Sequence, residues 1–204
     1  MVKNVRIPVS DSDIELEGRL GAAPVSAVVA PPHPLYGGNL SNPVVSALRD
    51  GLARRGIGAL AFNWRGVGGS GGRPSGDATV AATDYITALA YVRSLGQRPL
   101  PWVAAGYSFG AATALAIAAR DPSVREVVVV APPVVMLPRT LSLAAANCRV
   151  TVVAASDDEF APIADLHAVF SGIDGARIVT VEDADHFFSL GGLESITDAA
   201  ADNG

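Results

Sequence analysis

One stretch limits the folds open to this chain more than any other, and it runs from residue 101 to residue 120. A short apolar run, which predicts a strand, meets a G-x-S-x-G motif at residues 106–110, and an alanine-rich segment typical of a helix follows at once. Ser108 is therefore predicted at the apex of a strand–turn–helix unit. Gly106 and Gly110 suit this turn, because strand and helix backbones approach too closely there for a Cβ atom. The N–H groups at the helix start would face charge developing beside the serine, so the position suits a nucleophile.

A second match to the same pattern, at residues 68–72 around Ser70, shows that the motif is weak evidence by itself. That match lies in a glycine-rich loop, and no helix opens at its end, so its context selects Ser108 and rejects Ser70. The overlapping G-x-G-x-x-G pattern at residues 66–71 follows a predicted strand and would suggest a dinucleotide site. The region about twenty residues further on is a predicted helix and not a strand ending in an acid, so we predict no nucleotide cofactor.

Composition narrows the classes of protein. The 204 residues are enough for one well-cored domain spanning residues 1–204, and 50% of them are hydrophobic. A net charge of -5 gives no basic surface for nucleic acid or for an anionic membrane. The first residues lack the apolar segment of a signal peptide, and the single cysteine, Cys148, excludes an intramolecular disulfide. We therefore expect a cytoplasmic protein with a buried structural thiol.

Apolar runs and helical periodicity alternate along the chain. Predicted strands cover residues 2–9, 14–20, 25–30, 57–64, 102–105, 124–131, 150–155 and 177–181. Predicted helices cover residues 42–55, 79–95, 162–170 and 193–201, besides the helix after Ser108. This alternation indicates a doubly wound α/β fold, in which a mostly parallel sheet carries helices on both faces and begins with antiparallel strands. The strands ending at residue 131 and beginning at residue 150 are too close in sequence for a substantial cap domain.

A serine needs a base to take its proton at neutral pH, and the base works best when a carboxylate orients it. The chain has three histidines. His33 lies in a proline-flanked loop before the serine, and His167 falls inside a predicted helix, where a solvated residue is expected. His186 follows the last predicted strand, as the chain order serine, acid, histidine requires. The acid should follow the strand that ends near residue 155, and the candidates there are Asp157, Asp158 and Glu159.

Several short motifs occur together between residues 25 and 190. They are His33 to Gly38, Phe62 to Ser70, Gly106 to Gly110, Ala131-Pro132-Pro133, Asp158-Glu159 with Pro162, and Ala184 to Phe188. In this combination the chain resembles the small bacterial α/β-hydrolases that lack a lid, a group close to the dienelactone hydrolases. The resemblance implies an α/β-hydrolase fold and a serine hydrolase activity.

The resemblance also implies roles for single residues. Ser108 would be the nucleophile and His186 the general base. Asp158 would be the triad acid, because the acid of the family stands four residues before a proline and Pro162 fits that spacing. Asp157 is the alternative acid. Dienelactone hydrolases proper carry a cysteine where this chain has Ser108.

Two backbone N–H groups are predicted to form an oxyanion hole. One belongs to Phe109, the residue after the nucleophile, and the other to Leu35, since Pro34 before it has no N–H. Such donors typically contribute about a hundred- to a thousandfold in rate. His33 is then expected to shape the loop that carries Leu35. Substrate choice would rest on short loops and on five side chains: Tyr36, Tyr107, Met136, Phe187 and Phe188.

The sequence thus predicts a serine hydrolase that cleaves a small ester, thioester or lactone through an acyl-enzyme, without a metal or another cofactor. We expect the protein to bind a small-molecule substrate, and we expect it to bind neither nucleic acid nor a membrane. One alternative is a catalytically idle binding protein of the same fold, and the presence of serine, acid, histidine and both glycines argues against it. The other is a small-substrate peptidase, for which no cap or amine-binding acid cluster can be identified.

Overall fold

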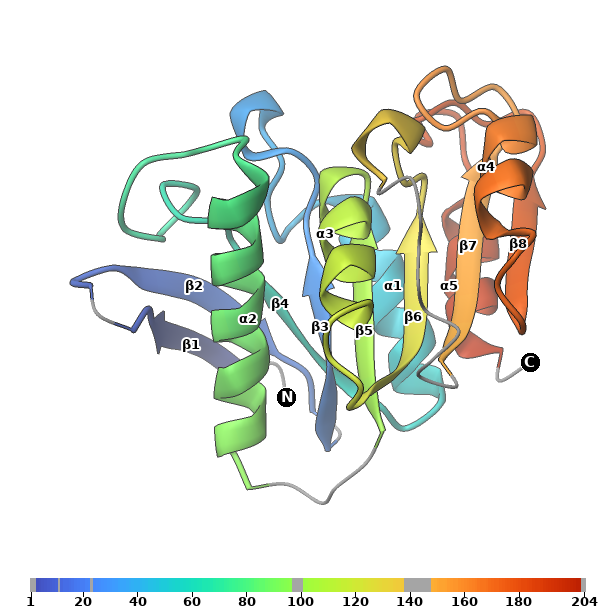
Figure 1. Ribbon diagram of the computed structural model, residues 1–204. Coiled ribbons are helices and arrows are strands. Elements are labelled where there is room, and N and C mark those ends of the chain that lie inside the picture. The colour runs from blue at the N-terminus through green and yellow to red at the C-terminus, as the bar shows by residue number, and fades with distance from the viewer. Residues whose placement is uncertain (1–2, 11, 23, 97–100, 138–147, 203–204) are drawn as a thin grey trace.

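A computed structural model describes residues 3–10, 12–22, 24–96, 101–137 and 148–202. Its centre is an eight-stranded sheet with the strand order β1-β2-β4-β3-β5-β6-β7-β8 (Figure 1). β2 pairs antiparallel with both β1 and β4, and the other strand pairs are parallel. The prediction of a mostly parallel α/β sheet with antiparallel N-terminal strands is therefore confirmed.

The elements follow the predicted alternation closely. The strands are β1 (Lys3–Pro8), β2 (Glu15–Leu20), β3 (Val25–Ala30), β4 (Gly58–Phe62), β5 (Trp102–Tyr107), β6 (Val124–Val130), β7 (Arg149–Ala155) and β8 (Ala176–Val181). The helices are α1 (Pro43–Arg54), α2 (Ala78–Ser94), α3 (Phe109–Ala118), α4 (Ile163–Phe170) and α5 (Leu193–Ala201), with short 3-10 turns η1 (Pro34–Tyr36) and η2 (Val134–Met136). Val2, the first residue of the first predicted strand, lies outside the described residues.

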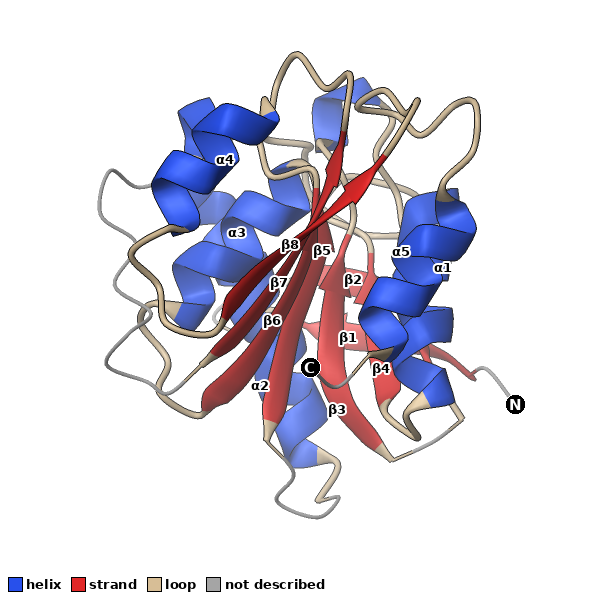
Figure 2. Cartoon of the chain, turned by 90° about the vertical axis from the view of Figure 1, so that its right-hand side faces the viewer, coloured by secondary structure: helices blue, strands red, loops and turns tan. Residues whose placement is uncertain are grey.

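Helices cover both faces of the sheet (Figure 2). α2, α3 and α4 lie on one face, and α1 and α5 lie on the other. The buried core is divided in the same way, with Tyr85 of α2 and Leu115 of α3 in one cluster and Leu48 of α1 and Ile196 of α5 in the other. The central strands β3 and β4 are buried along their whole length, which explains their continuous apolar sequences.

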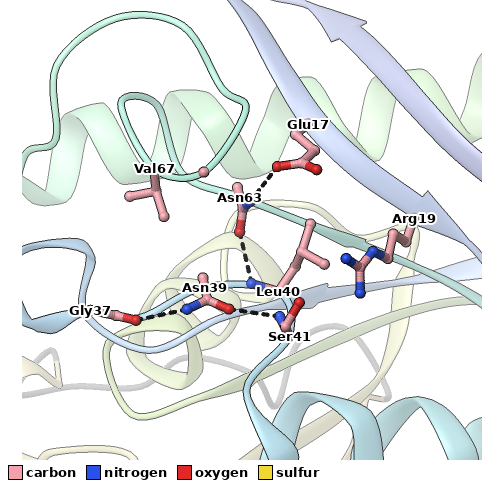
Figure 3. A pocket seen from close by; sticks show the side chains of 9 residues that line it. Glu17, Arg19, Gly37, Asn39, Leu40, Ser41, Asn63 and Val67 are labelled. Carbon is pink, nitrogen blue, oxygen red and sulfur yellow. Dashed lines mark hydrogen bonds between the residues drawn. The ribbon is translucent and has the colours of Figure 1, made fainter.

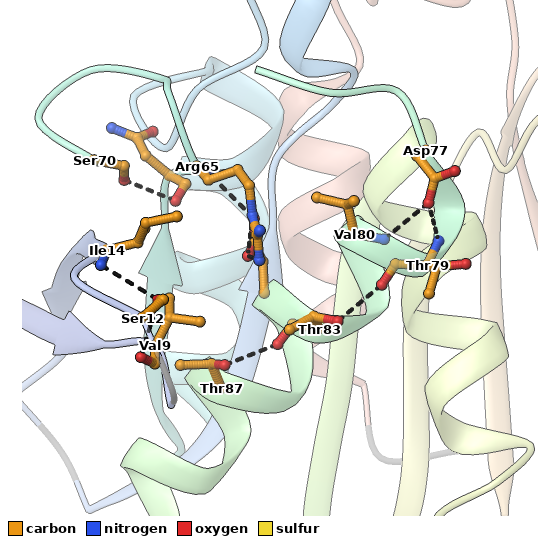
Figure 4. Close-up of polar contacts among 12 residues, drawn as sticks. Val9, Ser12, Ile14, Arg65, Ser70, Asp77, Thr79, Val80, Thr83 and Thr87 are labelled. Atoms are coloured by element: carbon orange, nitrogen blue, oxygen red, sulfur yellow. Dashed lines mark hydrogen bonds and ion pairs between the residues drawn. The ribbon is translucent and has the colours of Figure 1, made fainter. Parts of the chain in front are cut away.

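Side-chain caps fix where the helices on each face begin. Asn42 accepts a hydrogen bond from the N–H of Val44 at the start of α1. Asp77 accepts hydrogen bonds from the N–H groups of Thr79 and Val80 at the start of α2 (Figure 4). Such caps each contribute about 1 kcal/mol to helix stability.

The carboxyl ends of the parallel strands meet at the upper edge of the sheet in Figure 1. η1 follows β3, α3 follows β5 at once, and η2 follows β6. Ligands of open α/β sheets bind beyond this edge, so the polar residues that follow these strands form the candidate site. Among the described connections at this edge, none carries a cap helix. None of the described helices is long and apolar enough to cross a membrane.

Candidate active site

Ser108 lies in a strained turn between β5 and α3. Its φ of 53° and ψ of -118° fall in a region that residues other than glycine seldom adopt. A Cβ atom on Gly106 would lie 2.3 Å from the carbonyl oxygen of Gly110, so strand and helix approach as the sequence predicts. A Cβ atom on Gly110 would instead lie 2.5 Å from the carbonyl oxygens of Ala30 and Pro31. Gly110 therefore makes room for the connection that follows β3.

Backbone strain gathers at this edge of the sheet. In the described part of the chain, the non-glycine residues with positive φ are Ser108, Ala131, Asp183 and Phe188. Each of them lies just beyond the carboxyl end of β5, β6 or β8. Strained backbone of this kind is often found at functional sites.

Three polar side chains from three connections meet beside the turn. Ser108 Oγ lies 2.9 Å from His186 Nε2, and His186 Nδ1 lies 2.7 Å from Asp158 Oδ2. The exposed fractions of Ser108, His186 and Asp158 are 9%, 7% and 4%. A neutral His186 that donates its Nδ1 proton to Asp158 leaves Nε2 free to accept the Ser108 hydroxyl. This arrangement can remove the serine proton while the hydroxyl attacks an electrophile.

The three acids that follow β7 are placed differently. Asp158 turns Oδ2 to His186, and its Oδ1 accepts the N–H groups of residues 160 and 161 at 2.8 and 3.0 Å. Asp157 and Glu159 are both exposed. Of these three acids, Asp158 is therefore the one placed to orient the His186 ring.

His186 is held by its backbone as well as by its ring. The Tyr107 hydroxyl donates a hydrogen bond of 2.8 Å to the carbonyl oxygen of His186. The rings of Phe160 and Phe187 lie 4.9 and 5.3 Å from the imidazole, measured between centroids. Burial raises the pKa of Tyr107 above its usual range, so its hydroxyl stays a donor.

This placement changes the role of Tyr107. Tyr107 was expected to contact substrate, but it is only 2% exposed and its hydroxyl donates to the carbonyl oxygen of His186. Phe188, also expected to contact substrate, is buried as well. The Tyr107 side chain leaves β5 on the face packed against α1 and α5, in the same buried cluster as Val181 and Phe188. Tyr107 therefore positions the loop that carries His186, and is not placed to touch a substrate.

The two N–H groups predicted for the oxyanion hole lie in different settings. The N–H of Phe109 stands at the start of α3, directly after Ser108. The N–H of Leu35 donates to His33 Nδ1 at 3.2 Å. His33 thereby caps η1, and its ring packs against Phe109 with a centroid distance of 4.7 Å. His33 thus shapes the η1 loop and connects it to the Ser108 turn.

Large apolar side chains are exposed on the connections around these residues. The predicted substrate contacts among them have exposed fractions of 87%, 41% and 65%, for Tyr36, Met136 and Phe187. The most exposed of those not predicted as substrate contacts include three with exposed fractions of 92%, 53% and 89%: Val135, Phe160 and Leu190. A signal for them existed, since each is a large apolar residue in a segment that follows the carboxyl end of a parallel strand.

Ser70, Arg65 and His167 were excluded from a catalytic role by their sequence context, and the structure places them in the loop after β4 and on α4, outside the Ser108 turn. Ser70 Oγ donates to the carbonyl oxygen of Asn63 at 3.0 Å (Figure 4). It also accepts the Glu17 N–H of β2 at 2.8 Å. Arg65 binds the carboxylate of Asp84 through Nε and Nη2, at 2.9 and 2.6 Å. His167 is exposed on α4. In the described part of the chain, Ser70, Arg65 and His167 make no hydrogen bond to Ser108, His186 or Asp158, which fits the structural roles expected for them.

A cavity of about 350 Å³ lies between β2 and the loops of residues 37–41 and 63–68 (Figure 3). Its lining contains none of the three residues that meet at Ser108. Asn63 connects its walls, because Oδ1 accepts the Leu40 N–H and Nδ2 donates to Glu17 Oε2, both at 2.7 Å. Within the described ranges, no group of histidine, cysteine and acidic residues is arranged to hold a metal ion.

Comparisons with known proteins bear on this geometry. The family model described as Serine aminopeptidase, S33 (Hydrolase_4) matches residues 37–174. An uncharacterised protein of Rickettsia prowazekii is 34% identical over an alignment of 124 residues that covers 58% of this chain. The chain spans about half the length (51%) of that curated relative.

Two solved structures match nearly the whole chain. A structure of an alpha-beta serine hydrolase homologue from Coxiella burnetii is 28% identical, with a TM-score of 0.84 and coverage of 98% of this chain and 95% of that one. A serine hydrolase without a lid from Xanthomonas campestris is 27% identical, with a TM-score of 0.77 and coverage of 98% and 91%. Because the family model covers more than half of the chain and these structures share its fold, the chain belongs to the Hydrolase_4 family of α/β-hydrolase-fold serine hydrolases.

Proposed function

We propose that the protein hydrolyses a carboxylic ester, thioester or lactone with Ser108 as nucleophile, His186 as general base and Asp158 as the acid that orients it. The observation that carries the proposal is the continuous contact from Ser108 Oγ through both His186 nitrogens to Asp158 Oδ2, at 2.9 and 2.7 Å. Hydrogen-bonded serine, histidine and acid side chains in this order form the catalytic unit of many unrelated hydrolases.

In the first half-reaction, Ser108 Oγ attacks the substrate carbonyl carbon while its proton passes to His186 Nε2. Asp158 Oδ2 stabilises the imidazolium through the Nδ1 hydrogen bond. The carbonyl oxygen becomes negatively charged, and the N–H of Phe109 is one proposed donor to it. The alcohol or thiol then leaves with the proton from Nε2, and the acyl group stays bound to Ser108.

In the second half-reaction, His186 takes a proton from water, and the hydroxide formed attacks the acyl carbon. The proton returns to Ser108 Oγ as the carboxylic acid departs. We assign the second oxyanion contact to the N–H of Leu35. Because this N–H donates to His33 Nδ1 at 3.2 Å, the oxyanion would share or replace that acceptor.

The surroundings of Ser108 favour an ester over the N-terminus of a peptide, although the family description names a serine aminopeptidase. An aminopeptidase needs a carboxylate free to bind the substrate ammonium near the serine. Asp158 is committed to His186 and two N–H groups, and Asp185 accepts the N–H groups of Phe187 and Ser189. The other acids on the connections after β7 and β8, Asp157, Glu159, Glu182 and Asp183, are exposed to solvent, and none of them makes a hydrogen bond to Ser108 or His186 in the described part of the chain. The rings closest to His186 are apolar.

The test compares hydrolysis of p-nitrophenyl butyrate and of L-leucine p-nitroanilide by the wild type and by Ser108→Ala. We expect the wild type to cleave the ester much faster than the anilide, and Ser108→Ala to lose at least about 10³-fold in kcat. A fluorophosphonate should label the wild type and not the variant. Folded wild type that neither cleaves the ester nor reacts with the fluorophosphonate would favour the binding-protein alternative, and faster anilide cleavage would favour the peptidase.

A further inference from the structure

Exposed large apolar side chains are unevenly distributed over the described part of the chain. Apart from Ile86 on α2, all of them lie on η1, η2, the connections after β7 and β8, or the first residue of α5. These segments all stand at the carboxyl edge of the sheet, where Ser108 lies. Soluble proteins seldom expose contiguous apolar patches unless the patch binds a ligand or a partner.

Ring contacts place two of these side chains at His186 and connect a third to the Ser108 turn through His33. The Phe160 and Phe187 rings pack on the His186 imidazole. The carbonyl oxygen of Phe160 accepts the Val134 N–H at 3.0 Å, which joins the connection after β7 to η2. On the opposite side, the Tyr36 ring packs on His33, which packs on Phe109. Apolar side chains thus approach Ser108 and His186 from both sides.

The charge of the same connections is one-sided. Residues 31–41, 131–137, 156–162 and 182–192 contain no lysine or arginine. They do carry exposed carboxylates, on Asp157, Glu159, Glu182 and Asp183. Among these residues, an acyl group with its own carboxylate would find no lysine or arginine and would meet like charges, which is unfavourable.

We propose that these four connections bind the acyl group of an uncharged apolar ester, so that medium-chain acyl groups are preferred to acetyl and to acyl groups that end in a carboxylate. The binding surface is the apolar rim, defined as Tyr36, Val135, Met136, Phe160, Phe187 and Leu190. The inference rests on the proposed ester hydrolysis and names its substrate class. The acyl group remains in the site through both half-reactions, so contacts with it act in both.

The experiment measures kcat/KM for p-nitrophenyl acetate, butyrate and octanoate, and for the mono-p-nitrophenyl ester of suberic acid, which has the octanoyl chain length with a terminal carboxylate. All esters are kept below their micellar concentrations. Since each methylene that leaves water improves binding by about two- to fourfold, octanoate should exceed acetate by at least about twentyfold. The suberate ester should fall at least about tenfold below octanoate, because its carboxylate is desolvated without a partner.

Two rim variants and a matched control locate the effect. Val135→Ser and Leu190→Ser remove exposed apolar side chains from η2 and from the connection after β8. Each should lower the octanoate-to-acetate ratio of kcat/KM by about threefold or more. Ile86→Ser removes an apolar side chain that is 54% exposed on α2, and the ratio should stay at the wild-type value.

The outcomes separate this inference from the proposed function. Ser108-dependent cleavage with a flat acyl series, or with the suberate ester equal to octanoate, would overturn the rim assignment and leave the ester hydrolase standing. An unchanged ratio in both rim variants, with a dimer in sedimentation that these variants dissociate, would make the rim a contact between copies and also overturn it. No ester cleavage at all would remove the proposed function itself.

Discussion

At the scale of single residues, Asp158 divides its two oxygens between two tasks. Oδ1 accepts two N–H groups from the start of the next segment, and Oδ2 faces His186 Nδ1. The first set of hydrogen bonds fixes the carboxylate, and the fixed carboxylate sets the direction of the imidazole. Asp157, one residue earlier, is turned to solvent.

We expect Asp158→Asn to lower kcat for p-nitrophenyl butyrate by roughly 10³–10⁴-fold, because an amide can hold the His186 ring in the wrong tautomer. Asp157→Asn is the matched control and should change kcat by less than about twofold, since an exposed side chain makes little difference. A larger loss in Asp157→Asn than in Asp158→Asn would reverse the assignment of the acid.

His33 provides a prediction about pH. Burial lowers the pKa of His33 below its usual value, and the neutral ring accepts the Leu35 N–H through Nδ1. The unfolded chain therefore binds more protons at this residue than the folded one, below the ordinary histidine pKa of about 6.5. The stabilisation from His33 should be complete above about pH 6.5 and be lost as the pH falls through the lowered folded value.

Urea unfolding of the wild type and of His33→Asn between about pH 5 and 8 tests this sign. Asparagine can still cap the η1 turn but does not titrate. The wild type should lose more stability than His33→Asn on acidification, because the other titrating groups are common to both proteins. A difference between the two that stays constant with pH would contradict the prediction.

The sequence reduced the candidate catalytic residues to a few. The structure supplied the directions in which loops and side chains turn, which spacing along a chain does not contain. Chain order pointed to Ser108 and His186, because a motif and a strand end can be recognised in one sequence. The choice between Asp157 and Asp158 depends on which way a loop turns after its strand. Tyr107 was misplaced for a similar reason, since its position on β5 sends the ring into the core.

At the scale of elements, the loop after β4 fastens the N-terminal strands to the candidate site. Asn63 donates to Glu17 on β2 and accepts the N–H of Leu40, in the segment that continues from η1 (Figure 3). Ser70 of the same loop adds a hydrogen bond to β2, because its Oγ accepts the N–H of Glu17. The glycine loop that resembled a dinucleotide motif is thus an internal support for the η1 segment.

Asn63→Leu should destabilise the fold by about 1–3 kcal/mol, because it leaves the buried Leu40 N–H without an acceptor. We also expect a lower kcat, since Leu40 belongs to the segment that follows η1. The same substitution at the exposed Asn4 is the control and should change the free energy of unfolding by less than about 0.5 kcal/mol. Equal stability of the two variants in urea would contradict the role of Asn63.

The elements themselves were predictable to within one or two residues at each end. β3 and β4 are apolar along nearly all of their length, and β6 is apolar over residues 127–130, because both faces are covered there; this pattern is visible in the sequence. α1 and α2 begin at Asn42 and Asp77, whose capping chemistry is local. The pairing of β2 with β4 is not local, and no short segment of sequence encodes it.

At the scale of the whole molecule, the two ends of the sheet differ. Cys148 lies immediately before β7, at the end opposite Ser108, and is 4% exposed. Burial raises the pKa of its thiol to about 11, so the reactive thiolate is scarce near neutral pH.

Iodoacetamide at pH 7.5 should therefore leave ester hydrolysis unchanged, whereas a fluorophosphonate abolishes it. The measurement is residual activity, with mass spectrometry to locate each label. Loss of activity that parallels alkylation of Cys148 would contradict the prediction that this thiol takes no part in ester hydrolysis.

The positive φ of Ser108 has a consequence for the stability of the whole molecule. A residue other than glycine in such a conformation costs of order 1–3 kcal/mol. Ser108→Gly should relax the turn and raise the free energy of unfolding by about 1 kcal/mol, whereas Ser108→Ala, equally inactive, keeps the Cβ atom and should not. Equal urea midpoints for the two variants would contradict the prediction. A more stable but inert Ser108→Gly would mean that selection for reactivity has overridden selection for robustness at this turn, so that thermostable variants are better sought at the amino ends of the strands.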